Sequence, residues 1–152
     1  KGKELALSQI SRGADVIFTA AGATNTGVFD AIEDKGKLGI GVDSNQNWVK
    51  PGKILTSMMK RVDVAVFDEI KGATTGKFKS GMENFSLANK GVDYAVDQYN
   101  DKLLDADTRK KVEAIRQEIL SGKILVSDYY VTRKLCPSSP FKCEKFRKRT
   151  GP

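Results

Sequence analysis

Two short apolar runs, each followed directly by small or polar residues, constrain the fold of this chain most strongly. Residues 16–21 lead into Gly22 and an amphipathic pattern over 25–35, and residues 38–42 lead straight into Asp43. Such runs predict neighbouring parallel strands buried on both faces, and strand, turn and helix in this order predict βα units. Ligands of open α/β sheets bind at the carboxyl ends of strands. The turns at Gly22 and Asp43 are therefore candidates for a ligand site.

The rest of the chain predicts a mixed α/β order. Further helices are expected over residues 3–11, 60–73 and 105–120, and short strands over 54–58, 82–88 and 92–96, with a turn over 89–91. Gly13 and Gly36 are expected to end the first two helices, and Thr24 or Asn25 to cap the second. That second helix is expected to bury one stripe: Val28, Phe29, Ala31 and Ile32. The helix over 60–73 carries apolar residues on one predicted buried face: Val62, Val66, Phe67 and Ile70. Four aromatic side chains are expected in the core: Phe18, Phe29, Phe67 and Phe85. Because the first predicted element is a helix with no strand before it, we expect the chain to begin within a domain.

Composition argues against several classes of function. The 152 residues include no His, which removes Ser-His-Asp and Cys-His nucleophile pairs and imidazole metal sites. We therefore expect a protein that is not an enzyme and that needs no metal and no cofactor. The two cysteines, Cys136 and Cys143, are too few for a closed zinc site. They form either a local disulfide or two unrelated thiols.

The net charge of +7 is concentrated near the end of the chain. Residues 128–152 hold seven Lys or Arg and two acids, whereas the preceding residues are nearly balanced. Periodicity also disappears there, so we expect two parts: an α/β domain over 1–124 and a basic, Cys-containing tail over 125–152. Nucleic-acid binding would depend on this tail alone. A solvated segment is the expectation, with no nucleic-acid partner.

Six sequence blocks carry a family resemblance: Lys1-Gly-Lys-Glu-Leu-Ala6, Gly13-Ala-Asp-Val-Ile-Phe18, Ala20-Ala-Gly22, Thr26-Gly-Val-Phe29, Ile40-Gly-Val-Asp-Ser44 and Leu55-Thr-Ser-Met-Met-Lys-Arg-Val-Asp63. In this order and spacing they resemble the basic membrane protein family, the substrate-binding lipoproteins of ABC transporters that include purine nucleoside receptors. The resemblance covers residues 1 to about 124. The tail from Asp128 does not match it.

The resemblance implies a type I periplasmic-binding-protein fold, in which two α/β lobes close on a ligand. This chain is similar to the C-terminal portion, mostly the second lobe. The family also implies a small-molecule solute such as a purine nucleoside, and an ABC transporter permease as partner. Its members are extracytoplasmic, either anchored to the membrane by an N-terminal lipid or periplasmic.

Four residues are candidates for ligand binding: Ala21, Gly22, Asp43 and Lys60. The resemblance implies that Asp43 accepts hydrogen bonds from the ribose hydroxyls, which suits a carboxylate with two acceptor oxygens. It also implies that Lys60, predicted to open the helix after the third strand, approaches the ribose and the carboxylate. Ala21 and Gly22 would leave space and expose backbone groups. The alternatives are an Asp that caps its own loop, a solvated Lys and a tight turn without a ligand.

A second hypothesis is that the chain is a fragment of a Rossmann-like enzyme or of a sugar-binding regulator with the same βα geometry. A nicotinamide enzyme would carry Gly-x-Gly-x-x-Gly after its first strand, and this chain does not. The segment from Gly22 to Gly27 is followed by Val28 and Phe29 where a phosphate loop needs Lys and Ser or Thr. The sequence therefore favours a binding module over an enzyme.

Overall fold

The computed structural model describes residues 1–126, and the tail with Cys136 and Cys143 lies outside the described residues. The chain divides into two compact units, Lys1–Val112 and Glu113–Pro152. In the described part of the chain, no helix is long and apolar enough to cross a bilayer. The sheet and all four candidate site residues belong to the first unit.

The elements follow one another in mixed α/β order. The helices are α1 (Gly2–Ser11), α2 (Asn25–Asp34), α3 (Val62–Thr74) and α4 (Ala106–Leu120), with 3₁₀ turns η1 (Gly22–Thr24) and η2 (Asn47–Val49). The strands are β1 (Val16–Phe18), β2 (Leu38–Asp43), β3 (Ile54–Lys60) and β4 (Val92–Tyr94). The left-handed residues Gly13 and Gly36 follow α1 and α2, as predicted for helix ends.

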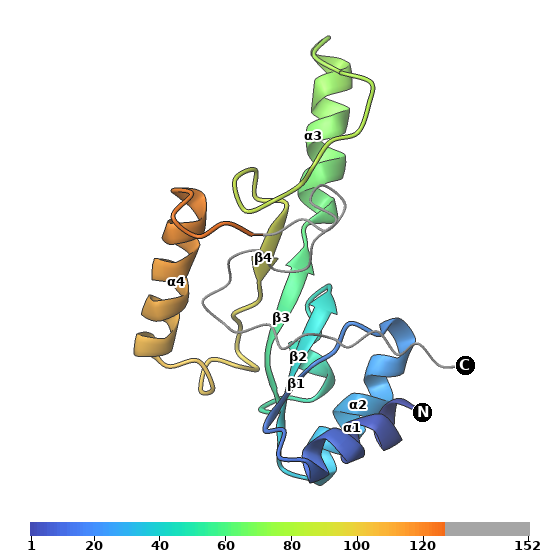
Figure 1. Ribbon diagram of the computed structural model, residues 1–152. Helices are drawn as coiled ribbons and strands as arrows, with labels where there is room; N and C mark the ends of the chain where they lie inside the picture. The colour runs from blue at the N-terminus through green and yellow to red at the C-terminus, as the bar shows by residue number, and fades with distance from the viewer. Residues whose placement is uncertain (127–152) are drawn as a thin grey trace, which may run out of the picture. The chain divides into compact units, whose positions relative to one another are not determined.

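One four-stranded sheet has the order β1-β2-β3-β4. β1, β2 and β3 are parallel, with Ile17 opposite Gly39 and Val42 opposite Met58. β4 runs antiparallel to β3. The carboxyl ends of the three parallel strands therefore meet at one edge of the sheet (Figure 1). The predicted parallel pairing of the first two strands is confirmed.

The core lies between the sheet and the helices α1 and α2, which run side by side (Figure 1). Its buried side chains come from both layers: Ala6, Ile17, Val28, Phe29, Ala31, Ile32 and Ile54. The fit is close at Gly39, where a Cβ would lie 2.6 Å from Cδ1 of Ile32. The predicted buried stripe of α2 is confirmed.

The prediction that residues 16–21 form a strand buried on both faces is wrong. β1 ends at Phe18, and only Ile17 of its three residues is buried. Val16 is 44% exposed and Phe18 is 55% exposed. The helices cover one face of this edge strand, so Phe18 is not a core residue. An apolar run indicates which side chains favour burial, but not whether a second layer covers them.

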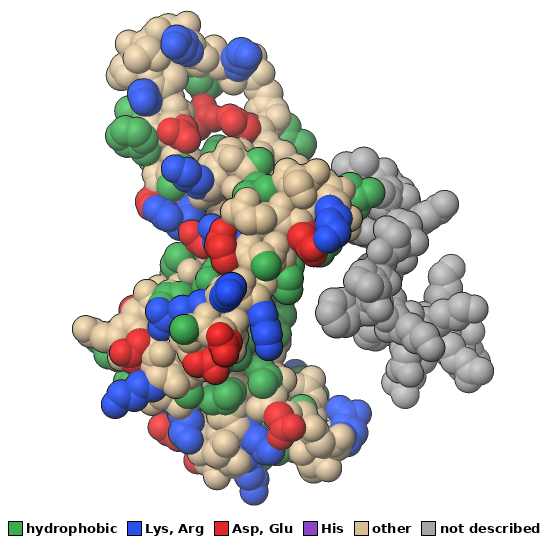
Figure 2. Space-filling view, turned by 90° about the vertical axis from the view of Figure 1, so that its left-hand side faces the viewer, with side chains coloured by type: hydrophobic (Ala, Val, Ile, Leu, Met, Phe, Trp, Pro, Cys, Tyr) green, Lys and Arg blue, Asp and Glu red, His purple; other side chains and the backbone are tan. Residues whose placement is uncertain are grey.

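The buried face predicted for the helix over 60–73 is also wrong, because no residue of α3 is buried. Four apolar side chains of α3 are more than half exposed: Val62, Val66, Phe67 and Ile70. α3 extends away from the end of β3, and the chain returns beside it before β4 (Figure 1). Figure 2 shows hydrophobic side chains at the surface in this region. Helical spacing thus identified an apolar stripe that the described residues leave uncovered.

Two predicted boundaries also change, and one predicted strand does not form. β3 continues to Lys60, so Lys60 ends a strand and does not open a helix. Residues 82–88 form no strand, and β4 ends at Tyr94. The expected turn before β4 is present, with the Gly91 N–H donating to the Ser86 carbonyl oxygen at 2.8 Å. Asp105 caps α4, since its Oδ1 accepts the Thr108 N–H at 2.6 Å.

The exposed stripe of α3 leads to a prediction about solution behaviour. Contiguous apolar surface promotes association, so we expect the chain to form concentration-dependent oligomers. Val66→Glu should shift sedimentation equilibrium towards the monomer, because it places a charge in the middle of the stripe. The matched control is Thr74→Glu, which adds the same charge to α3 without removing an apolar side chain. A chain that is monomeric without substitution would contradict this expectation.

Candidate functional site

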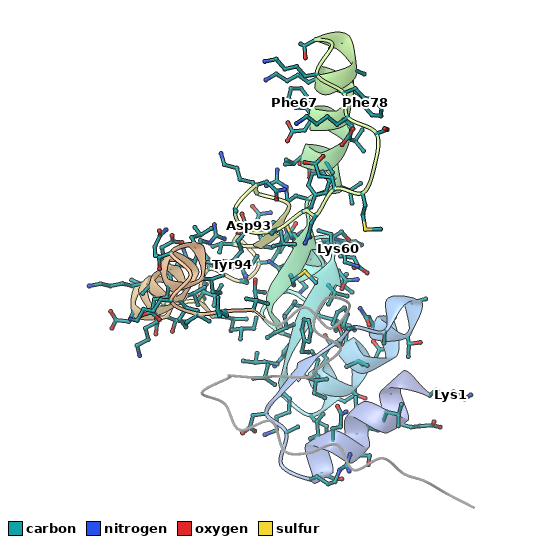
Figure 3. The ribbon with its side chains drawn as sticks, turned by 45° about the horizontal axis from the view of Figure 1, so that its top comes forward. Lys1, Lys60, Phe67, Phe78, Asp93 and Tyr94 are labelled. Atoms are coloured by element: carbon teal, nitrogen blue, oxygen red, sulfur yellow. The ribbon has the colours of Figure 1, made fainter. Side chains whose placement is uncertain are left out.

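Asp43 and Lys60 meet at the carboxyl edge of the parallel strands. Asp43 is the last residue of β2, and Lys60 is the last residue of β3. Lys60 Nζ lies 2.7 Å from Asp43 Oδ1 in an ion pair whose side chains are 61% and 55% exposed. Figure 3 shows Lys60 where β3 leads into α3. The pair is therefore open to a ligand and combines a two-oxygen acceptor with a cationic donor.

The backbone of Asp43 is unusual, with a φ of 71°. The Ser44 N–H donates to the Val42 carbonyl oxygen at 2.9 Å, which closes a γ-turn around Asp43. γ-turns with a positive central φ are the rarer and more strained form. Asp tolerates this region better than most residues, but strained non-glycine residues concentrate at functional sites. The strained backbone therefore indicates a functional role for Asp43 more strongly than its position in the sequence does.

Ala21 and Gly22 lie in the turn after β1, at the same edge of the sheet, and both are exposed. Gly22 has a φ of 56°, which favours glycine. The Ala21 N–H donates to Asn25 Oδ1 at 3.2 Å. The sequence indicated Thr24 or Asn25 as a cap of the following helix, but neither side chain caps α2. Asn25 instead fixes the preceding turn.

A polar network connects this turn to the loop that follows Asp43. Gln46 Oε1 accepts hydrogen bonds from Asn25 Nδ2 at 3.4 Å and from the Val42 N–H at 3.2 Å. The Gln46 N–H donates to Ser57 Oγ at 3.0 Å. Asn25 and Ser57 are buried. The network thus ties the ends of β1 and β2 to the middle of β3, which fixes the backbone on which Asp43 stands.

Asp97 anchors the other side of the same loop. Its Oδ2 accepts hydrogen bonds from Nδ2 of Asn45 at 2.6 Å and of Asn47 at 3.0 Å. Burial tends to raise the pKa of Asp97, but these bonds and those from backbone N–H groups outweigh it and hold the pKa below its usual value. In the described part of the chain, every buried side-chain nitrogen or oxygen has a hydrogen-bond partner.

Sequence reasoning missed this supporting network. Its members are Asn25, Gln46, Asn47, Ser57, Asp97 and Asn100. The available signal was the run Asp43-Ser-Asn-Gln-Asn47, which holds three amide side chains directly after an apolar strand. Trp48 lies beside it in the sequence and is 62% exposed.

A separate hollow lies elsewhere in the first unit. It has a volume of about 720 Å³ and is lined by Glu69 of α3 and by residues 78–85. None of the four candidate residues lines it. The candidate site is an open edge of the sheet, because the Asp43 and Lys60 side chains are more than half exposed there.

Comparison with known proteins places this fold in the class of ABC transporter solute-binding proteins. A crystal structure of such a protein from Aeropyrum pernix matches with a TM-score of 0.69 and 26% sequence identity, covering 83% of this chain and 44% of that chain. The predicted fold class, a parallel-dominated α/β sheet flanked by helices, is confirmed.

The family described as "ABC transporter substrate-binding protein PnrA-like" (Bmp) matches residues 1–129, and the chain belongs to it. The chain is 36% identical over 133 residues to an uncharacterized lipoprotein of Pyrococcus horikoshii, covering 77% of this chain and 33% of that protein. It is 32% identical over 145 residues to the "ABC transporter nucleoside-binding protein BmpA" of Lactococcus lactis, covering 83% and 40%.

The chain thus spans between one third and two fifths of the length of these two relatives. The family description and the lipoprotein name agree with the extracytoplasmic localisation expected from the sequence, which is confirmed at the level of the family. The names of these proteins describe solute binding rather than catalysis.

Proposed function

We propose that this chain is the C-terminal part of a receptor that binds a purine nucleoside and delivers it to an ABC transporter permease. The Asp43–Lys60 ion pair carries the proposal, because it presents an ionised acceptor and a cationic donor at an exposed strand edge. A carboxylate can accept both hydroxyls of a ribose cis-diol, and Lys60 can donate to a hydroxyl oxygen. Ala21 and Gly22 would border the same ligand.

Two further features support the proposal. The Lactococcus lactis relative is named a nucleoside-binding protein. The loop around Asp43 is held by hydrogen bonds to Gln46, Asn47 and Ser57, so the carboxylate is already positioned before a ligand arrives. Preorganised groups lose less free energy on binding. Attachment of the complete receptor to the membrane by a lipid belongs to the same proposal.

The test uses a chimera in which residues 1–124 replace the matching part of the Lactococcus lactis relative. We expect Asp43→Asn to weaken inosine binding about ten- to a hundredfold in calorimetric titration, because hydrogen bonds to a charged group contribute roughly 1.5–3 kcal/mol. Asn tolerates the left-handed backbone of this position, so the substitution isolates the charge.

Two controls sharpen this experiment. Asp101→Asn removes a charge from an exposed residue in the segment between β4 and α4 and should leave the affinity unchanged. 2′-Deoxyinosine lacks one hydroxyl, so the preference for inosine over 2′-deoxyinosine should shrink in Asp43→Asn. An unchanged inosine affinity in that variant would remove the assigned role of the carboxylate.

A further inference from the structure

The carboxylate of Asp97 joins two segments that lie far apart in the sequence. Asp97 follows β4, whereas the side chains that donate to its Oδ2, those of Asn45 and Asn47, follow β2. Its other oxygen, Oδ1, accepts the Tyr99 N–H at 2.8 Å. Three donors therefore converge on one carboxylate, from the loop after Asp43 and from the segment after β4.

On the β2 side, these bonds fix the loop that begins at Asp43. Asn45 Oδ1 accepts the Asn47 N–H at 2.9 Å. Asn47 is fully buried, and its Oδ1 accepts the Ser57 hydroxyl at 2.8 Å. The side-chain oxygen of Asn45 thus accepts a bond within the loop, and that of Asn47 accepts one from β3. The Nδ2 groups of both residues donate to Asp97. Release of Asp97 would leave two amide donors without this acceptor, directly beside the strained γ-turn at Asp43.

On the β4 side, Asp97 is itself held to the sheet. Its N–H donates to Asn100 Oδ1 at 2.8 Å. Asn100 is fully buried, and its Nδ2 donates to the carbonyl oxygens of Leu55 and Ala95, each at 2.9 Å. The Ala95 N–H donates to the Ser57 carbonyl oxygen at 2.9 Å. The carboxylate is thus held in place relative to β3, and it can in turn hold the loop after β2.

We propose that Asp97 is a positioning residue that holds the loop 43–47, and through it the left-handed Asp43, in the geometry that receives the ligand. The ligand part of this inference rests on the proposed function. An ionised carboxylate offers only acceptors, and here three N–H groups need them. An Asn at this position would turn an NH₂ group towards at least one of these donors, so a nearly isosteric substitution breaks the arrangement.

The first experiment needs no ligand and uses the 152-residue chain. Hydrogen exchange should show the amides of Val42, Gln46 and Asn47 exchanging at least tenfold faster in Asp97→Asn, while those of the core helix α2 change little. The control Asp101→Asn removes an equal charge four residues later and should leave both regions unchanged.

A double variant separates positioning from general stability. In Asn45→Asp with Asp97→Asn, the side chain at 97 donates to that at 45, so one link returns with its direction reversed. We expect this double variant to recover part of the protection lost at Val42, Gln46 and Asn47. Unchanged exchange in Asp97→Asn would overturn the proposal. An equal rise in the exchange rates of α2 and of the loop would also overturn it, if the double variant does not reverse that rise.

The ligand experiment uses the chimera described above. Asp97→Asn should weaken inosine binding about tenfold although Asp43 and Lys60 are intact, and the double variant should recover part of the loss. Unchanged affinity in Asp97→Asn would overturn the positioning role. If the unsubstituted chimera does not bind inosine, the proposed function fails, and the exchange experiment still decides whether Asp97 holds the loop.

Discussion

We expect the 152-residue chain to bind inosine, guanosine and adenosine about a thousandfold more weakly than the chimera described above, which contains the rest of the Lactococcus lactis relative. Ligand pockets enclose most of the ligand surface, whereas the Asp43–Lys60 pair is more than half exposed at one edge of a sheet. Loss of about 4 kcal/mol of contact with a second wall corresponds to about a thousandfold in affinity. Calorimetric titration of both proteins measures the difference.

Asp43→Asn in both proteins is the control for this comparison. If the carboxylate contacts the ribose, the substitution weakens binding by a similar factor with and without the second wall. Micromolar or tighter binding by the monomeric 152-residue chain would contradict the expectation. The edge of the sheet that carries Asp43 and Lys60 would then be sufficient for tight binding without a second wall.

Phe29→Ala is expected to lower the free energy of unfolding by about 3–5 kcal/mol. Phe29 is 1% exposed and belongs to the core between the sheet and the two helices α1 and α2. Its ring also lines the close approach of α2 to Gly39, with Cδ1 3.6 Å from where a Cβ there would lie. Because small domains have about 5–15 kcal/mol of stability in total, urea unfolding followed by circular dichroism would detect this loss readily.

Phe18→Ala provides the matched control, since it removes the same side chain from a residue that is 55% exposed. Surface substitutions usually change stability by less than about 0.5 kcal/mol. The sequence predicted both aromatic residues in the core, so this pair tests the largest difference between expectation and structure. Similar losses for Phe18→Ala and Phe29→Ala would indicate that the exposed face of β1 is covered in solution.

The local pattern of the sequence was sufficient for several features. The stripe Val28, Phe29, Ala31 and Ile32 predicted the buried face of α2, because spacing along one helix depends only on the helical period. The glycines at 13 and 36 predicted two helix ends, because a left-handed backbone is a local requirement. The parallel pairing of β1 and β2 followed from a βα unit with a short connection.

The candidate site likewise combines a feature that the local sequence predicts with one that depends on the fold. An apolar run that ends in Asp43 is sufficient to predict a carboxylate at the edge of the sheet, because the end of a strand is a local feature. Its 2.7 Å contact with Lys60 depends on the register of β2 and β3, in which Asp43 lies opposite Met59. The boundary at Lys60 was wrong because continued pairing with β4, with Lys60 opposite Val92, extends the strand. Non-local hydrogen bonds of this kind leave no periodic signal in one segment.

The sequence by itself determined the βα units, the helix faces and the position of the carboxylate, since each depends on residues close together along the chain. Tertiary structure alone decided which apolar faces are covered, and therefore that Phe29 is buried while Phe18 and the stripe of α3 are exposed. It also decided that Asp97 meets Asn45 and Asn47 across about fifty residues of sequence. Burial and hydrogen-bond pairing depend on which distant segments meet, and that is a property of the folded chain.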